Sequence, residues 1–201
     1  MMKNLLRLST SLFEENSVSS ALSADLIFAL KGKGEDFNVI ERDFSKQAIP
    51  HLDGQWLKAI STPAAQRTAE QQEKVEFSDS LIAEIQVADI LVIGLPMYNF
   101  TVPSMLKAWI DHIARAGVTF AYTEQGPKGL LKNKKVYLVS AMGGVHDTPA
   151  TDFLRPYMKL IMGFIGLDDV EIINAGGLSM GEEPRAESLA AAQMKIQTLA
   201  A

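Results

Sequence analysis

Short apolar runs alternate along the chain with segments whose apolar residues recur at helical spacing. The runs predict five β-strands, near residues 4–8, 37–40, 90–95, 136–139 and 170–173. Residues 90–95 are apolar and rich in β-branched side chains, which is typical of a strand buried on both faces. The helical spacing predicts helices near residues 18–29, 77–88, 106–113, 153–165 and 189–199. This alternation predicts one α/β domain over residues 1–201, with a flavodoxin-like, three-layer α/β/α fold and a five-stranded parallel sheet.

Two long segments, 43–63 and 118–131, show neither periodicity, and we interpret both as irregular loops. Loops of this length are uncommon in a compact domain and are often functional. The second segment contains Phe120 and Tyr122. We expect these rings to be too exposed for ordinary core, and to form an apolar lid over a substrate or to reach across a dimer interface.

The composition narrows the class of function. The 201 residues include no cysteine, which excludes thiolate catalysis, cysteine-ligated metals and disulfides. The formal charge of −5 argues against a nucleic-acid partner. No apolar run approaches the roughly 20 residues that span a bilayer, and the start of the chain is too short and charged for a signal-peptide core. From the lack of both features we expect a soluble cytoplasmic protein. The histidines lack metal-ligand spacing, so we expect no metal site.

Chemistry is concentrated in three loops that follow predicted strands, where parallel α/β sheets bind ligands. The first loop places the hydroxyls of Ser11, Ser17 and Ser19 at a helix N-terminus, whose free N–H groups favour a phosphate. Alternatively, Ser17 is only an N-cap. The loop matches neither a Walker A motif nor G-x-G-x-x-G, so it favours the phosphate of a mononucleotide.

The second and third loops suit a flat ring with polar edges. The second is "PMYNF", which offers an aromatic ring, an amide and backbone donors to a ligand such as a flavin: Pro96, Met97, Tyr98, Asn99 and Phe100. Alternatively, its rings pack on the core. The third loop includes Ala141, Met142, Gly143 and Gly144, and its glycines permit close backbone approach, although a tight turn explains them equally well. His146 follows and could reach a substrate or a flavin edge.

The "PMYNF" run, residues 114–135 and "GGVH" at 143–146 closely resemble the FMN-dependent NADH azoreductases, a family of flavodoxin-like quinone reductases formerly described as acyl-carrier-protein phosphodiesterases. The resemblance implies a homodimer that binds FMN, takes electrons from NADH or NADPH, and reduces quinones or azo compounds by a ping-pong mechanism. It also implies that Val18 joins the serines of the phosphate loop. Several relatives carry Arg where this chain has Met142, which bears on cofactor preference and substrate range.

The sequence therefore predicts an FMN-dependent oxidoreductase that acts on small planar aromatic substrates. A flavodoxin-type electron carrier is one alternative, but the long loops argue against the exposed flavin edge that a carrier needs. The phosphodiesterase of the older family description is a second alternative, and it would need a metal cluster or an activated nucleophile. A phosphorylated receiver module is a third, and it would need acidic residues where the first strand ends in Leu8, Ser9 and Thr10.

Overall fold

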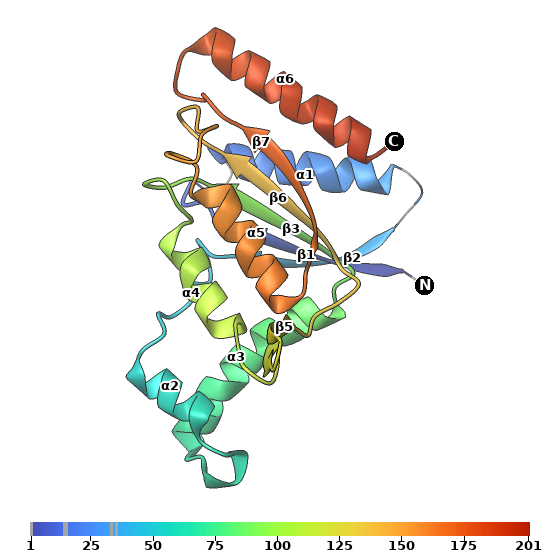
Figure 1. The fold of residues 1–201 in the computed structure, drawn as a ribbon. Coiled ribbons are helices and arrows are strands. Elements are labelled where there is room, and N and C mark those ends of the chain that lie inside the picture. The colour runs from blue at the N-terminus through green and yellow to red at the C-terminus, as the bar shows by residue number, and fades with distance from the viewer. Residues whose placement is uncertain (1, 14–15, 33, 35) are drawn as a thin grey trace.

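A five-stranded parallel sheet forms the centre of the computed structural model, which describes residues 2–13, 16–32, 34 and 36–201 (Figure 1). Its strands are β1 (Lys3–Ser9), β2 (Phe37–Asp43), β3 (Ile90–Pro96), β6 (Lys135–Ala141) and β7 (Asp169–Ala175). They lie in the order β2-β1-β3-β6-β7, and every residue of the central strand β3 is buried. The predicted flavodoxin-like fold is confirmed.

Helices cover both faces of the sheet. One face carries α1 (Val18–Lys31) and α6 (Glu182–Leu199), and the other carries α3 (Ala69–Val87), α4 (Ser104–Ile113) and α5 (Leu154–Ile165). Alternate residues of each strand feed two separate cores: Leu5 packs under α1, whereas Leu6 and Leu8 pack under the other layer. Trp109 of α4 is completely buried in the larger core. Among the described residues, no helix is both long and apolar enough to cross a bilayer.

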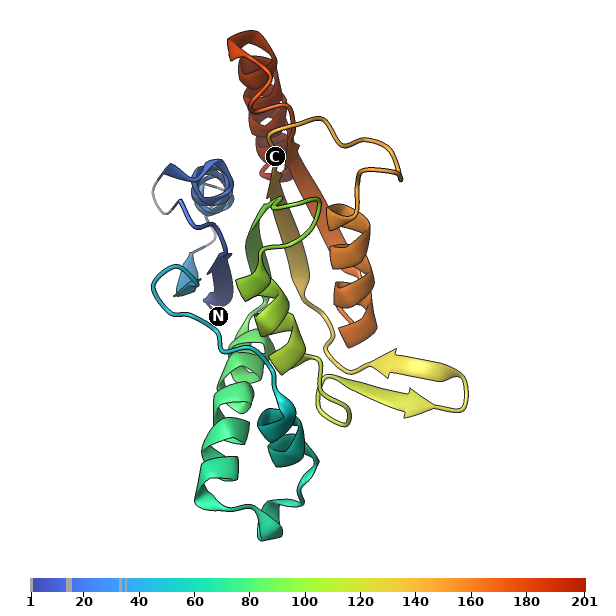
Figure 2. The same cartoon turned by 90° about the vertical axis from the view of Figure 1, so that its left-hand side faces the viewer.

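The prediction of an irregular loop over residues 43–63 is wrong, because this segment contains helix α2 (Gly54–Ser61). Asp53 caps the helix, and its carboxylate accepts hydrogen bonds from the N–H groups of Gln55 and Trp56 at 2.9 Å each. Trp56 is buried against Phe77 of α3, with ring centroids 5.5 Å apart. Figure 2 shows α2 beside the first half of α3, below the sheet.

Residues 118–131 are not an irregular loop either. They form an antiparallel hairpin of β4 (Phe120–Thr123) and β5 (Gly126–Gly129), which projects from the body of the molecule (Figure 2). The expected exposure of Phe120 is wrong: the ring is 7% exposed and lies 4.4 Å, centroid to centroid, from Phe164 of α5. Tyr122 agrees with the expectation, since it is 77% exposed.

Candidate functional site

The three predicted loops meet at the carboxyl edge of the sheet, because β1, β3 and β6 are neighbours in it. The hydroxyl of Tyr98 accepts a hydrogen bond from the N–H of Leu12 at 3.1 Å and lies 3.3 Å from the hydroxyl of Ser11. The N–H of Met97 donates to the carbonyl of Ala141 at 2.9 Å. The second loop is thus bonded to both of the others, as the sequence predicts.

The first loop presents unpaired donors at the start of α1. The N–H groups of Ser17, Val18 and Ser19 form no hydrogen bond with any residue that the structure describes. The hydroxyls of Ser17 and Ser19 lie 3.1 Å apart, and both side chains are buried. Ser17 is also the N-cap, since its hydroxyl accepts from the N–H of Ser20 at 3.3 Å, which is the capping role that the alternative interpretation gives it. The first turn of α1 holds no acidic residue, and this end of the helix therefore favours an anion.

The second loop is a tight two-residue turn. Tyr98 and Thr101 exchange backbone hydrogen bonds of 3.0 and 3.1 Å, and between them Asn99 and Phe100 have φ angles of 50° and 69°. Two consecutive left-handed residues are characteristic of a type I′ turn. Phenylalanine is rare in this conformation, which costs on the order of 1–3 kcal/mol. Phe100 is 51% exposed, so the alternative in which its ring packs on the core is wrong.

The third loop is supported by the loop that follows β7, which the sequence analysis missed. The carbonyls of Gly143 and Gly144 accept hydrogen bonds from the N–H groups of Ser179 and Gly177, each at 2.9 Å. A Cβ at Gly143 would lie 3.0 Å from the hydroxyl oxygen of Ser179. The N–H groups of the two glycines bond to no other part of the described chain. The third loop therefore offers two N–H donors to a ligand, at positions where a side chain would leave less room.

Met142 supports this loop from inside the protein. Its side chain is 1% exposed and belongs to the larger core. Its N–H donates to the carbonyl of Ala175 at 2.8 Å, and its carbonyl accepts from the N–H of Leu178 at 3.1 Å. With both backbone groups occupied, Met142 supplies packing, and the free donors of this loop come from the glycines that follow it.

His146 joins the second and third loops. Its ring packs edge-on against Phe100, with centroids 5.5 Å apart and planes at 86°. The Nδ1 atom is buried and has no hydrogen-bond partner within the described part of the chain. Arg155 of α5 donates to the carbonyl of His146 and forms an ion pair with Asp152 at 2.8 Å. The structure therefore places this predicted residue at the candidate site.

Phe120 and Tyr122 do not join the site within one chain. The hairpin that carries them is bonded to the C-terminal end of α5, where the N–H of Leu131 donates to the carbonyl of Ile165 at 3.0 Å. The helices that connect parallel strands run opposite to those strands, so this end of α5 lies at the other edge of the sheet. A role for these rings at a flavin therefore requires a second subunit.

Two grooves adjoin the second loop, between the first turns of α4 and α5. Their volumes are about 580 and 660 Å³, and Thr101 and Tyr157 line both. Tyr98 and Asn99 close the smaller groove, and Phe153 and Leu160 line the larger one. Burial raises the pKa of the Tyr157 phenol, so it is neutral near pH 7. Grooves of this size and character suit a planar apolar ligand or the surface of another subunit.

Comparison with known proteins matches this geometry to a family. A model of the flavodoxin-like fold matches residues 3–200. The chain is 50% identical over 193 residues to the FMN-dependent NADH:quinone oxidoreductase of Alcanivorax borkumensis, covering 96% of this chain and 98% of that protein. It is 49% identical over 185 residues to the protein of the same name from Cellvibrio japonicus, covering 92% and 93%. The chain belongs to this family of FMN-dependent NADH:quinone oxidoreductases.

Solved structures agree with the family assignment. An azoreductase from Bacillus anthracis strain Sterne has a TM-score of 0.89 and 28% identity, with 100% of this chain and 99% of that chain covered. An FMN-dependent NADH-azoreductase from B. anthracis strain Ames Ancestor, solved in complex with FMN, has a TM-score of 0.87 and 26% identity, covering 100% and 98%. The resemblance stated from the sequence motifs is confirmed.

The residues at the carboxyl edge fit FMN chemically. At the start of α1, three N–H groups without a partner among the described residues and two buried hydroxyls match a phosphate, which accepts several hydrogen bonds. The free N–H groups of Gly143 and Gly144 match the polar edge of a flavin ring, and the absence of a Cβ allows close approach. Among the described residues, no group of histidine and acidic side chains could hold a metal ion.

Proposed function

We propose that this protein is an FMN-dependent oxidoreductase that transfers electrons from NADH or NADPH to quinones and azo compounds. The observation that carries the proposal is the meeting of three loops at one sheet edge, where the first and third loops hold N–H groups that have no partner among the described residues. Ser11, Ser17, Val18 and Ser19 would hold the phosphate. The ring would be held by Pro96, Met97, Tyr98, Asn99, Phe100, Ala141, Gly143 and Gly144, with Met142 supporting the loop from the core.

FMN, when bound, supplies the redox chemistry by accepting two electrons from the nicotinamide and passing them to the acceptor. The protein binds and orients the participants. The free N–H groups of Gly143 and Gly144 stabilise negative charge near the ring, as oriented backbone donors do in oxyanion sites. The rigid turn at Asn99 and Phe100 fixes the second loop before any ligand arrives. Donor and acceptor would bind at the same site in turn, which predicts ping-pong kinetics.

The phosphate loop favours FMN over FAD. One helix N-terminus with serine hydroxyls provides for one terminal phosphate, and the sequence holds no dinucleotide fingerprint for a second. The test is to purify the protein with its flavin, release the flavin by heat, and identify it by chromatography, alongside NADH-dependent reduction of a naphthoquinone. FMN in stoichiometric amount with quinone turnover supports the proposal. Stoichiometric FAD, or bound FMN without turnover, contradicts it.

The active unit is a homodimer in which the hairpin of each subunit covers the site of the other. Tyr122 is 77% exposed on this hairpin, at the sheet edge opposite its own flavin loops, and the apolar grooves beside Tyr98 are open. A two-fold interface would bring these surfaces together. Since Phe120 is buried against Phe164, its ring holds the hairpin on α5. Tyr122 is then the ring of the hairpin that is available to contact an acceptor, together with His146.

Tyr122→Ala tests this arrangement. It should raise the KM for large planar acceptors and leave FMN affinity unchanged, whereas Phe28→Ala, at an 81% exposed ring on α1, should change neither. The second measurement is oligomeric state by sedimentation together with activity during dilution. A monomer that keeps full activity at nanomolar concentration would refute the shared site.

The flavodoxin-type electron carrier remains the second candidate, because the same three loops would also hold FMN in a carrier. The reactions distinguish the two, since a carrier does not oxidise NADH in repeated turnover with a small quinone alone. For an NADH-dependent reductase we also propose a cytoplasmic location, which the cysteine-free sequence permits.

A further inference from the structure

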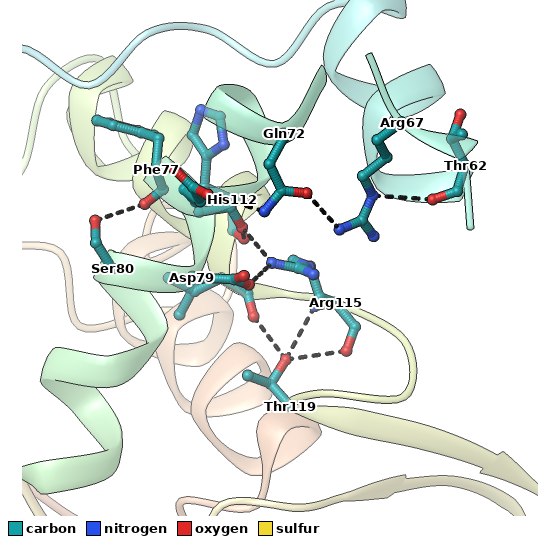
Figure 3. Close-up of polar contacts among 12 residues, drawn as sticks. Thr62, Arg67, Gln72, Phe77, Asp79, Ser80, His112, Arg115 and Thr119 are labelled. Carbon is teal, nitrogen blue, oxygen red and sulfur yellow. Dashed lines mark hydrogen bonds and ion pairs between the residues drawn. The ribbon is translucent and has the colours of Figure 1, made fainter. Parts of the chain in front are cut away.

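The root of the β4–β5 hairpin is tied to the end of α4 by a buried hydroxyl (Figure 3). Thr119 is fully buried, and its Oγ1 donates to the carbonyl of Ile113 at 2.6 Å and accepts from the N–H of Arg115 at 2.9 Å. The carbonyl of Thr119 accepts from the N–H of Leu130, on the returning side of the hairpin, at 2.9 Å. The direction of the hairpin is therefore set immediately beyond α4.

The side chain of Arg115 fixes this root to α3. Its side chain is 9% exposed and forms an ion pair with Asp79 (Figure 3). Its guanidinium also donates to the hydroxyl of Ser78 at 3.1 Å. Ser78 is fully buried and donates to the carbonyl of His112 at 2.7 Å. The Nε of Arg115 is buried without a partner in the described part of the chain. A buried guanidinium is costly unless it is paired, so Asp79 strongly favours one placement of Arg115.

The direction of the hairpin depends on this root together with its contacts on α5. Its two strands have four residues each, and a two-stranded hairpin is at best marginally stable by itself in water. Its other attachment is at α5, where Gly129 crosses Gly166 in close contact and Phe120 packs on Phe164. Tyr122 is exposed and lies further out on the hairpin, with its ring edge-on to Phe120 at 5.4 Å between centroids, so a small rotation at the root moves both rings together and carries Tyr122 further than the root.

We propose that Arg115 is a positioning residue for the reductase: held by Asp79 and Ser78, it sets the direction of the hairpin and thereby the place of Tyr122 over the flavin site of the second subunit. This inference rests on the proposed function, in which the hairpin of one subunit covers the site of the other. Arg115 touches neither flavin nor substrate, and it acts only through the backbone that leads to Tyr122.

The test is Asp79→Asn, which removes the charge opposite Arg115 at a side chain that is 54% exposed. Glu41→Gln is the matched control, because Glu41 is also 54% exposed and pairs with a largely buried arginine, Arg7, at 2.9 Å. Thr119→Val is a second variant that loosens the same root through a different bond. Thermal unfolding confirms that each variant is folded.

Two readouts separate positioning from simple loss of stability. The first is the KM for a large planar naphthoquinone compared with that for benzoquinone, with kcat and FMN affinity measured in parallel. The second is energy transfer to bound FMN from a dye at Lys128→Cys, an exposed hairpin site in a chain without cysteine. Asp79→Asn and Thr119→Val should change the energy transfer and raise the KM for the large quinone by about 3- to 10-fold. The KM for benzoquinone and the affinity for FMN should not change in these variants. The Glu41→Gln control should leave all of these quantities unchanged.

The outcomes distinguish this inference from the proposal beneath it. If neither the transfer nor the KM changes while Tyr122→Ala still raises the KM, the hairpin covers the site but Arg115 does not position it, and the inference is overturned alone. If the energy transfer changes and the KM for the large quinone does not, or if Tyr122→Ala has no effect on that KM, the shared site is wrong. Both the shared site and the positioning role of Arg115 are then overturned.

Discussion

Replacing Ser17 and Ser19 separately and together should resolve how the phosphate loop binds FMN. Each hydroxyl can donate one hydrogen bond to a charged phosphate, a type of bond that contributes about 1.5–3 kcal/mol. The two hydroxyls already lie 3.1 Å apart and bond to each other, so that bond must be exchanged when the phosphate binds. The double variant should therefore lose roughly 1–3 kcal/mol of binding free energy, which raises the Kd for FMN about 5- to 150-fold.

Stability separates the two serines. Ser17 caps α1 through a hydrogen bond of 3.3 Å from the N–H of Ser20, so Ser17→Ala should also lower the unfolding free energy by about 0.5–1 kcal/mol. Among the described residues the Ser19 hydroxyl has one hydrogen-bond partner, Ser17, and Ser19→Ala should weaken FMN binding with little change in stability. Thr68→Ala is the control, since Thr68 caps α3 in a capping box and belongs to none of the three loops.

The assay is titration of flavin-free protein with FMN, followed by flavin fluorescence, together with urea unfolding of the same variants. Turnover at saturating FMN should change little, because these serines hold the phosphate and lie on a different loop from the ring contacts. An unchanged Kd in the double variant would place the phosphate elsewhere. Equal weakening by Thr68→Ala would mean that stability, and not contact, governs the affinity.

Two further predictions concern stability. Phe100→Gly should be more stable than Phe100→Ala by about 1 kcal/mol in urea unfolding, because glycine adopts a φ of 69° without strain. Val145 is the control, since it is 57% exposed and lacks a positive φ, and there the alanine variant should be more stable than the glycine variant. Burial lowers the pKa of His112, whose Nε2 lies 2.8 Å from the carbonyl oxygen of Pro50. The unfolded chain then binds more protons, so stability should fall as the pH drops below about 6.5, and His112→Gln should flatten that slope.

The sheet and the three loops could be predicted because burial on two faces leaves continuous apolar runs, and because parallel strands bring the loops that follow them to one edge. The loop after β7 follows the same rule. Gly176 and Gly177 come directly after that strand, one position nearer to its end than Gly143 and Gly144 are to the end of β6. This pair of glycines after a strand was the signal from which the loop that supports the third loop could have been predicted.

The short elements could not be predicted because their stability comes from distant residues. In α2 only Trp56 and Ala59 are buried, so the helix has no long apolar face, and Asp53 was its one clear signal. The hairpin strands are short, and Phe120 is buried by Phe164, which belongs to another part of the chain. The periodicity of apolar residues reflects neighbours along the chain, so it does not reveal contacts between residues that are far apart in the sequence.

The crossing of Gly129 over Gly166 limits which substitutions this chain can accept. A Cβ at Gly129 would lie 2.1 Å from the backbone nitrogen of Gly166, and a Cβ at Gly166 would lie 2.3 Å from the carbonyl oxygen of Leu131 and 2.9 Å from the carbonyl carbon of Gly129. Both positions are already glycine, so neither can be made smaller to accommodate a change in the other. A lineage can therefore keep the hairpin only by keeping both glycines, and a descendant that loses one must reroute or delete the segment. The pair becomes a two-residue marker with which uncharacterised sequences can be sorted into those that carry this hairpin and those that do not, before any of them is purified.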